Sequence, residues 1–138
     1  MREIMFRGKR TDGKGWMYGY YSFNPTTNIH WIRTPRTTYW DEDMIAPSTV
    51  GQYTGLKDKN GKRIFEGDIV AQNWYDYDEP RDDSFGKVVF CEYDCSFSVM
   101  DVNKDGFMPL GRCGSYHWEV EVIGNIHDNP ELLKGGEG

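Results

Sequence analysis

The chain has 138 residues, of which 38% are hydrophobic and 15% aromatic, and this length suits a single domain with a buried core. Its net charge of −6 at pH 7 argues against non-specific binding to duplex DNA, which depends on lysine and arginine neutralising phosphates. No apolar run approaches the roughly 18 residues that a membrane-spanning helix requires, so we expect neither a membrane span nor a membrane partner.

The cysteines and the N-terminus indicate a compartment. Three cysteines, an odd number, sit in no framework typical of secreted proteins, and the first residues contain no apolar signal segment. We therefore expect a cytoplasmic protein. Abundant aromatic residues and glycines favour β-strands joined by tight turns.

Four short strands are predicted in the first third of the chain, over residues 4–9, 16–23, 29–33 and 37–40. In the third strand, one face should carry Ile29, Trp31 and Arg33. Pro35 is expected to end the pairing, and the acidic residues 41–43 are expected to begin a connection. These patterns predict an N-terminal β-meander.

The middle of the chain contains the clearest hairpin signal. Apolar runs over 50–56 and 64–70 flank Asn60-Gly61, a pair that readily takes the positive φ angles of a two-residue turn. The second run contains Gly67-Asp68, which resembles the opening segment of SH3-like small barrels. In such barrels the glycine relieves a bend and the aspartate closes a turn.

Residues 76–84 are acidic and contain a proline, so we expect a mobile loop there. Further strands are predicted over 87–92, 96–102 and 118–123. In the last strand, alternate residues should face the core, namely Trp118, Val120 and Val122. Asn129 and Pro130 predict the N-cap and the first position of one helical turn.

Two stretches resemble a known family. Val50–Val70 reads VGQYTGLKDKNGKRIFEGDIV and Val120–Leu133 reads VEVIGNIHDNPELL, and they are similar to the core and closing motifs of the YopX family of phage and prophage proteins. The likeness covers approximately residues 1–134. It implies a phage or prophage protein inside a bacterial host cell, and no biochemical activity is established for that family. The motif residues, expected to be structural, are Gly51, Tyr53, Gly55, Asn60, Gly61, Gly67, Asp68, Gly124 and Asn125.

The patterns and the resemblance together predict an all-β fold with little helix. An N-terminal β-meander, residues 1–47, is expected to pack on a small SH3-like, partly closed β-barrel over residues 48–134, which contains the YopX-type motif. Residues 135–138, which are rich in glycine, should form a loose tail. We expect one compact unit.

Two residue sets could hold a metal, although we predict no cofactor. Three thiolates and an imidazole form a legitimate zinc shell, and the candidates are Cys91, Cys95, Cys113 and His117. Buried, unpaired cysteines are the commoner alternative. The first half of a calcium loop is matched by Asp101, Asn103 and Asp105, but its second half fails because Arg112 stands where a bidentate glutamate is needed. A plain hairpin turn is the alternative.

The sequence predicts no catalytic residue. The histidines have no recognisable nucleophile beside them, and the chain contains no phosphate-binding loop. The acidic residues of 76–83 could form a two-metal site. A solvated loop, or a surface that mimics a nucleic-acid backbone toward a DNA-binding partner, is the alternative for this segment.

Aromatic and basic residues of the N-terminal strands are the candidate ligand-binding set. Rings beside cations stack bases and hold phosphates, so these strands could bind a nucleotide, a cyclic signal nucleotide or a single-stranded nucleic acid. A core or an oligomer interface is the alternative. The candidate residues are Trp16, Tyr18, Tyr20, Trp31, Arg33, Arg36 and Trp40.

The resemblance and the lack of catalytic motifs favour a non-enzymatic accessory protein of a phage or prophage, which binds and sequesters or blocks a host component. An anti-defence role would be one form of this function. Open edge strands could also pair copies of the chain into a homo-oligomer. Capture of a nucleotide or single-stranded nucleic acid is the second hypothesis, and a metal-dependent enzyme is the third.

Overall fold

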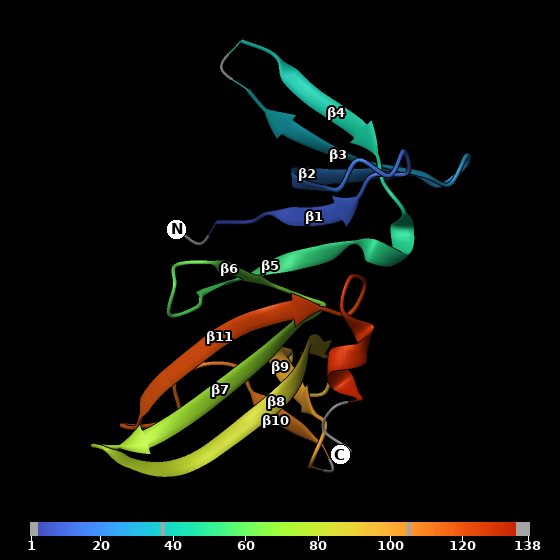
Figure 1. Cartoon of the computed structure of the whole chain (residues 1–138). Helices are drawn as coiled ribbons and strands as arrows, with labels where there is room; N and C mark the ends of the chain where they lie inside the picture. Colours follow the sequence, from blue (N-terminus) through green and yellow to red (C-terminus); the bar gives the residue numbers. More distant parts are fainter. Residues whose placement is uncertain (1–2, 37, 105, 135–138) are drawn as a thin grey trace. The chain divides into compact units, whose positions relative to one another are not determined.

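The computed structural model describes residues 3–36, 38–104 and 106–134, in which almost all regular structure is β-strand (Figure 1). The chain divides into two compact units, Met1–Gly55 and Leu56–Gly138. The all-β class is therefore confirmed. No helix in the described part of the chain is long and apolar enough to cross a membrane. The predicted tail, residues 135–138, lies outside the described residues.

The first unit contains four strands that run in meander order, β1 to β4, with β5 added beside β1. Strands follow one another side by side in the sheet order β4-β3-β2-β1-β5. The short 3₁₀ helix η1 (Pro47–Thr49) precedes β5. The strands are β1 (Phe6–Lys9), β2 (Trp16–Asn24), β3 (Ile29–Pro35), β4 (Trp40–Met44) and β5 (Gly51–Lys57). Met17, Ile32 and Ile45 form the core of this unit.

The boundaries of the fourth strand correct the prediction. Residues 41–43, expected to form a connection, are the centre of β4, and Pro35 continues the ladder as the partner of Trp40. The acidic residues are tolerated because arginines of neighbouring segments pair with them, as Arg33 does with Glu42 at 2.9 Å. Thr37, expected to begin a strand, lies outside the described residues.

The second unit contains an open antiparallel sheet in the order β10-β9-β8-β7-β11. Its edge strands do not pair with each other, so the partly closed barrel expected in this region is not formed by the described residues. The strands are β6 (Arg63–Phe65), β7 (Asp68–Asp76), β8 (Glu79–Cys91), β9 (Ser96–Asp101), β10 (Phe107–Pro109) and β11 (His117–Asn125). The 3₁₀ helix η2 (Pro130–Leu133) follows.

The core of the second unit agrees with the predicted alternation. Val120 of β11 is buried together with Val70, Val88 and Val99, and both Trp118 and Val122 pack against this cluster. The strands predicted over 87–92 and 96–102 are also present, and they pair with each other as β8 and β9.

The prediction of a mobile loop over residues 76–84 is wrong. Asp76 ends β7, Glu79 begins β8 and pairs with it, and only Tyr77 and Asp78 form the turn. The acidic composition misled the prediction because exposed carboxylates remain hydrated on a two-stranded ribbon whose backbone bonds are satisfied. Ion pairs also offset the charge, as between Arg81 and Asp76 at 2.9 Å.

The hairpin predicted at Asn60-Gly61 is confirmed, since β5 and β6 are neighbouring strands, but its turn is longer than two residues. Only Gly61, at φ +81°, takes the left-handed conformation. The N–H of Gly61 donates to the carbonyl of Asp58 at 2.9 Å, and the N–H of Asp58 donates to the carbonyl of Lys62 at 2.8 Å.

The Asp58 carboxylate holds this turn and fastens it to β11. Its Oδ1 accepts the N–H groups of Asn60 and Lys62, each at 2.9 Å, and its Oδ2 accepts the N–H of Val122 at 3.0 Å. The N–H of Lys59 donates to the carbonyl of Val120 at 2.9 Å. Two segments far apart in sequence are thus joined through one buried side chain.

The other motif residues are structural too. Gly67 takes φ +88°, and Asp68, which is almost fully buried, accepts the N–H of Phe65 at 2.8 Å, so the predicted bend and turn closure are confirmed. A Cβ on Gly124 would lie 2.6 Å from Oδ1 of Asn129. Gly51 and Tyr53 are buried in β5, and Gly55 takes φ +90°.

The closing motif folds back on itself. Oδ1 of Asn125 accepts the N–H groups of His127 and Asp128, each at 2.9 Å. The predicted helical turn is present as η2 with Pro130 at its start, but the side chain of Asn129 does not cap it. Instead, its Oδ1 accepts the N–H of Asn125 at 3.2 Å, because the chain turns sharply after β11.

Replacement of Asp58 by asparagine should destabilise the fold by about 2 kcal/mol, since an amide nitrogen would then face a backbone N–H donor. Burial alone would raise the pKa of Asp58, but the three backbone N–H groups outweigh it and hold this pKa below its ordinary value. The stabilisation is therefore present above the unfolded pKa of about 4 and is lost as pH falls through the folded pKa. Urea unfolding from pH 7 to pH 2.5 should show the two proteins converging at acidic pH. A constant difference across that range would contradict this role of the carboxylate.

Candidate functional site: an aromatic face on the first sheet

Strand register gathers the predicted aromatic and basic residues on one side of the first sheet. Tyr20 of β2 lies opposite Arg33 of β3, which in turn lies opposite Glu42 of β4. In the next row, Ser22 pairs with Trp31 and Trp31 with Met44. We call Tyr20, Trp31, Arg33 and Trp40 the aromatic face.

Contacts hold the arginine of this face in one orientation. Both Nε and Nη2 of Arg33 donate to Oε2 of Glu42, at 3.0 Å and 2.9 Å. The guanidinium lies over the indole of Trp40, 5.2 Å from its ring centroid, and the Trp40 and Tyr20 rings are 6.0 Å apart. An arginine fixed between an aromatic ring and a carboxylate loses little conformational freedom when it binds a ligand.

The aromatic face is open to solvent. Tyr20 is 59% exposed and Trp40 is 53% exposed, whereas Met17 and Ile32, on the other side of the sheet, are buried. Scattered exposed apolar residues are common in proteins, but here large rings and a guanidinium occupy adjoining positions on neighbouring strands. This clustering is typical of recognition surfaces.

Gly19 allows the two central strands of the face to approach each other. A Cβ at this position would lie 2.2 Å from the carbonyl oxygen of Arg33, so only glycine fits without displacing β3. Thr34 adds a second link, since its hydroxyl donates to the carbonyl of Tyr18 at 2.5 Å. The position of Arg33 on the surface therefore depends on a residue that is itself buried.

The remaining candidates for ligand binding are placed differently. Tyr18 is exposed and precedes Tyr20 on the same side of β2, but Trp16 is half-buried beneath two cations. Arg7 and Lys9 lie 4.7 Å and 5.8 Å from the centroid of the Trp16 rings. Arg36 lies beyond the end of β3, where it pairs with Asp41 at 3.3 Å. Glu42 and Met44, which complete the surface, were missed because their segment was predicted to be a connection.

His30 lies on the other side of the sheet, where its ring nitrogens are hydrogen-bonded to neighbouring side chains. Its Nε2 is 3.1 Å from Oδ1 of Asn28, which can only accept, so Nε2 carries the proton and Nδ1 accepts from the hydroxyl of Tyr21 at 2.6 Å. Burial raises the pKa of that hydroxyl. The rings of Phe23 and Tyr21 stack on His30 with centroid separations of 5.1 Å and 5.8 Å. This arrangement provides no accessible nucleophile.

The four candidate zinc ligands are not brought together in the described part of the chain. Cys91 is buried at the end of β8, Cys95 is exposed in the following turn, and Cys113 lies in the connection before β11. His117 instead contacts Glu119 at 3.4 Å. In the described part of the chain, no group of three or more histidine, cysteine, aspartate or glutamate side chains could hold a metal ion.

The partial calcium motif forms the turn between the paired strands β9 and β10. Oδ1 of Asp101 accepts the N–H of Asn103 at 2.7 Å, and its Oδ2 accepts the N–H of Phe85 at 3.1 Å. The carboxylate oxygens are therefore already used by the backbone. Asp105, the third candidate ligand, lies outside the described residues.

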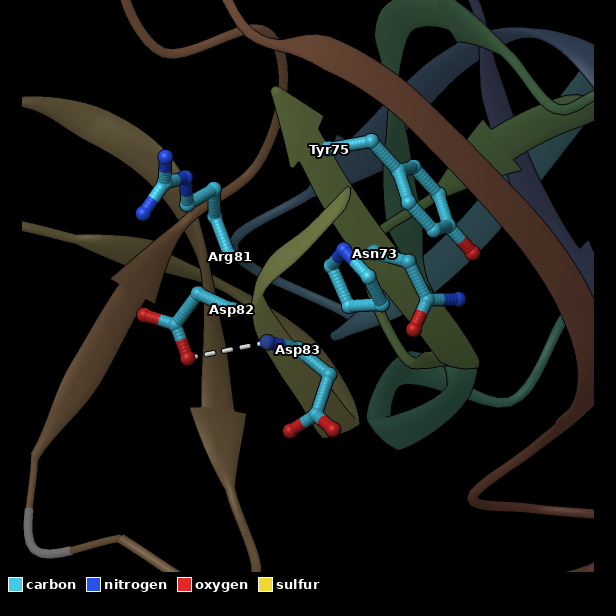
Figure 2. A pocket seen from close by; sticks show the side chains of 6 residues that line it. Asn73, Tyr75, Arg81, Asp82 and Asp83 are labelled. Carbon is cyan, nitrogen blue, oxygen red and sulfur yellow. Dashed lines mark hydrogen bonds between the residues drawn. The ribbon is translucent and has the colours of Figure 1, made fainter. Parts of the chain in front are cut away.

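A shallow hollow of about 360 Å³ lies on the acidic ribbon of β7 and β8. Figure 2 shows Asn73 and Tyr75 on one side of it and Arg81, Asp82 and Asp83 on the other. The Lys104 ammonium donates to Asp82 at 2.7 Å, and this bond, together with the N–H of Asp83, lowers the pKa of Asp82. An ionised carboxylate that is already paired with a lysine is poorly suited to proton transfer.

Comparisons with known proteins agree with the fold. The sequence model of the family described as YopX protein matches residues 5–134. Among solved structures, the crystal structure of protein EF1440 from Enterococcus faecalis is similar, with 27% sequence identity and a TM-score of 0.55. The similarity covers 96% of this chain and 99% of that chain. No curated protein matches the chain.

Replacement of Gly19 by alanine should destabilise the protein by about 1–3 kcal/mol, because the added methyl group overlaps the carbonyl of Arg33. The matched control is Ser22→Ala on the exposed side of the same strand, which should change stability by less than about 0.5 kcal/mol. Chemical denaturation measures both variants. Equal stability of the two would contradict the close approach of β2 and β3.

Proposed function

The chain belongs to the YopX family, and from this premise we propose that it is a non-enzymatic accessory protein of a phage or prophage, which binds a host protein and sequesters or blocks it. The proposal rests on one observation, the aromatic face. Its two exposed rings and its arginine, already fixed by Trp40 and Glu42, are the residue types that carry most binding energy in protein interfaces. An anti-defence function would follow if the blocked component belongs to a host defence system.

The resolved pKa shifts of four charged groups do not point to acid–base catalysis. The pKa values of Asp58 and Asp82 are lowered, and those of Lys59 and Lys104 are raised. Each shift stabilises the charged form that these groups already have at neutral pH. An enzyme using acid–base chemistry instead tunes such groups toward its working pH.

Binding of a nucleotide or a single-stranded nucleic acid is the second candidate function. Tyr20 and Trp40 are exposed rings beside a guanidinium, which is the combination that stacks bases. The local charges oppose this candidate function, because Arg33 is already ion-paired with Glu42 and Arg36 with Asp41. A phosphate would have to displace these carboxylates, so we favour a protein partner.

Removal of either exposed ring should weaken partner binding. Host proteins retained by the tagged protein would be identified by mass spectrometry, and their dissociation constants then measured by calorimetry. Tyr20→Ala and Trp40→Ala should each weaken binding by about tenfold to a hundredfold, which corresponds to about 1.4–2.8 kcal/mol. Tyr93→Ala is the matched control, since Tyr93 is a fully exposed ring in the turn between β8 and β9 and belongs to the second unit. Unchanged affinity in both ring variants would exclude the aromatic face as the binding surface.

A panel of nucleotides, cyclic nucleotides and a short single-stranded oligonucleotide tests the second candidate. Since the arginines are already paired, we expect no thermal stabilisation of the wild-type protein by any of them. A stabilisation that disappears in both Trp31→Ala and Arg33→Ala, with both variants still folded, would instead favour nucleotide binding and contradict our preference for a protein partner.

A further inference from the structure

β4 is an open edge of the first sheet. It is the last strand in the sheet order, with β3 beside it (Figure 1), and immediately after β4 the residue Ile45 forms an isolated bridge with Arg10. The N–H of Ile45 donates to the carbonyl of His30. Because backbone groups of an antiparallel strand alternate in direction, Asp43 and Asp41 also turn theirs toward β3. Trp40, Glu42 and Met44 therefore direct their backbone groups outward.

The outward groups are available only at the start of the strand. At its end, the carbonyl of Met44 accepts the N–H of Thr11 at 3.1 Å, and the N–H of Met44 donates to Oδ1 of Asp43 at 3.0 Å. The backbone groups of Met44 are therefore not available to an additional strand. Trp40 and Glu42 remain as the positions at which another strand could hydrogen-bond, and the exposed ring of Trp40 lies beside them.

The charge pattern argues against a second copy of the chain at this edge. When two copies of one strand pair antiparallel about a twofold axis, the central residue lies opposite itself. Centring the pair on Asp41, Glu42 or Asp43 would place like charges opposite each other, which is destabilising. Pairing of two copies in these registers is therefore disfavoured, whereas a basic strand meets the opposite charge.

The carboxylates of β4 can accept a further cation. Each pairs with one arginine of its own unit, and the side chains of Asp41, Glu42 and Asp43 remain 40%, 41% and 29% exposed. A lysine or arginine that approaches from the open side reaches them without displacing β3.

We propose that β4 accepts an extended, lysine- or arginine-rich segment of a partner protein as an additional antiparallel strand. The outward backbone groups of Trp40 and Glu42 supply main-chain hydrogen bonds, the carboxylates select basic side chains, and Trp40 packs against the side chains between them. This inference rests on the proposed function and adds the chemistry of the partner to it.

Three seven-residue peptides test the inference on the full-length protein by fluorescence anisotropy. The first alternates lysine with valine, the second replaces each lysine with glutamate, and the third is the basic peptide N-methylated on the backbone amides that would face β4. The basic peptide should bind, and each of the others should bind at least about tenfold more weakly. Equal binding of the basic and N-methylated peptides would overturn strand addition, because charge alone would then suffice.

Variants at Glu42 separate the backbone contribution from the charge. Its N–H points outward, so Glu42→Pro removes a donor of the open edge and leaves the ladder with β3 intact. We expect Glu42→Gln to weaken binding of the basic peptide by a few fold and Glu42→Pro to abolish it. Equal effects of the two variants would contradict the inference. If Glu42→Pro does not fold, protection of the Glu42 amide from hydrogen exchange by the basic peptide replaces it as the test, and lack of protection contradicts strand addition.

Two further outcomes distinguish this inference from the proposed function. Tyr20→Ala should weaken binding of the basic peptide much less than Glu42→Pro does, because Tyr20 lies two strands from the edge and can affect the peptide only through the ring of Trp40. If an identified host partner is lost with Tyr20→Ala but is unaffected by Glu42→Pro, the proposed function stands and this inference fails. If the wild-type protein dimerises and Glu42→Pro dissociates the dimer, a second copy occupies β4 and the inference is overturned.

Discussion

The Asp58 carboxylate accepts hydrogen bonds from three backbone N–H groups, and the second unit depends on this constraint. It fixes the turn after β5 and, through Val122, a strand that lies 64 residues further along the chain. A carboxylate can satisfy several donors at once, whereas a buried carboxylate without them would be strongly disfavoured. One side chain therefore holds the local turn and ties it to β11, a strand that is also paired along its length with β7.

The residues of the family motif and those of the proposed recognition surface have different roles. The two motif stretches contain Asp58, Asp68 and Asn125, and each of these side chains accepts hydrogen bonds from the backbone. These side chains therefore have a structural role in the fold. The candidate recognition residues lie instead on the first sheet, where Tyr20, Arg33 and Trp40 project from strands that the motif does not include.

Period-two alternation made the meander and most strands of the second unit predictable from the sequence, along with the shared face of the rings in β2 and β3. Prediction from composition failed where a strand carries many charged residues. β4 and the start of β8 were missed because their acidic residues suggest loops, although arginines and lysines from other segments compensate them. The alternation pattern also could not predict the hydrogen bonds made by buried side chains. Gln72, which is fully buried, joins Ser84, Pro109 and Trp118 through its side chain, and no local pattern predicts such partners.

Amide hydrogen exchange of the protein with and without its captured partner tests most directly whether recognition lies outside the motif. We expect the partner to slow exchange in β2, β3 and β4 and to leave exchange in residues 50–70 and 120–133 unchanged. Protection confined to those two motif stretches, with no change in the first sheet, would contradict this expectation.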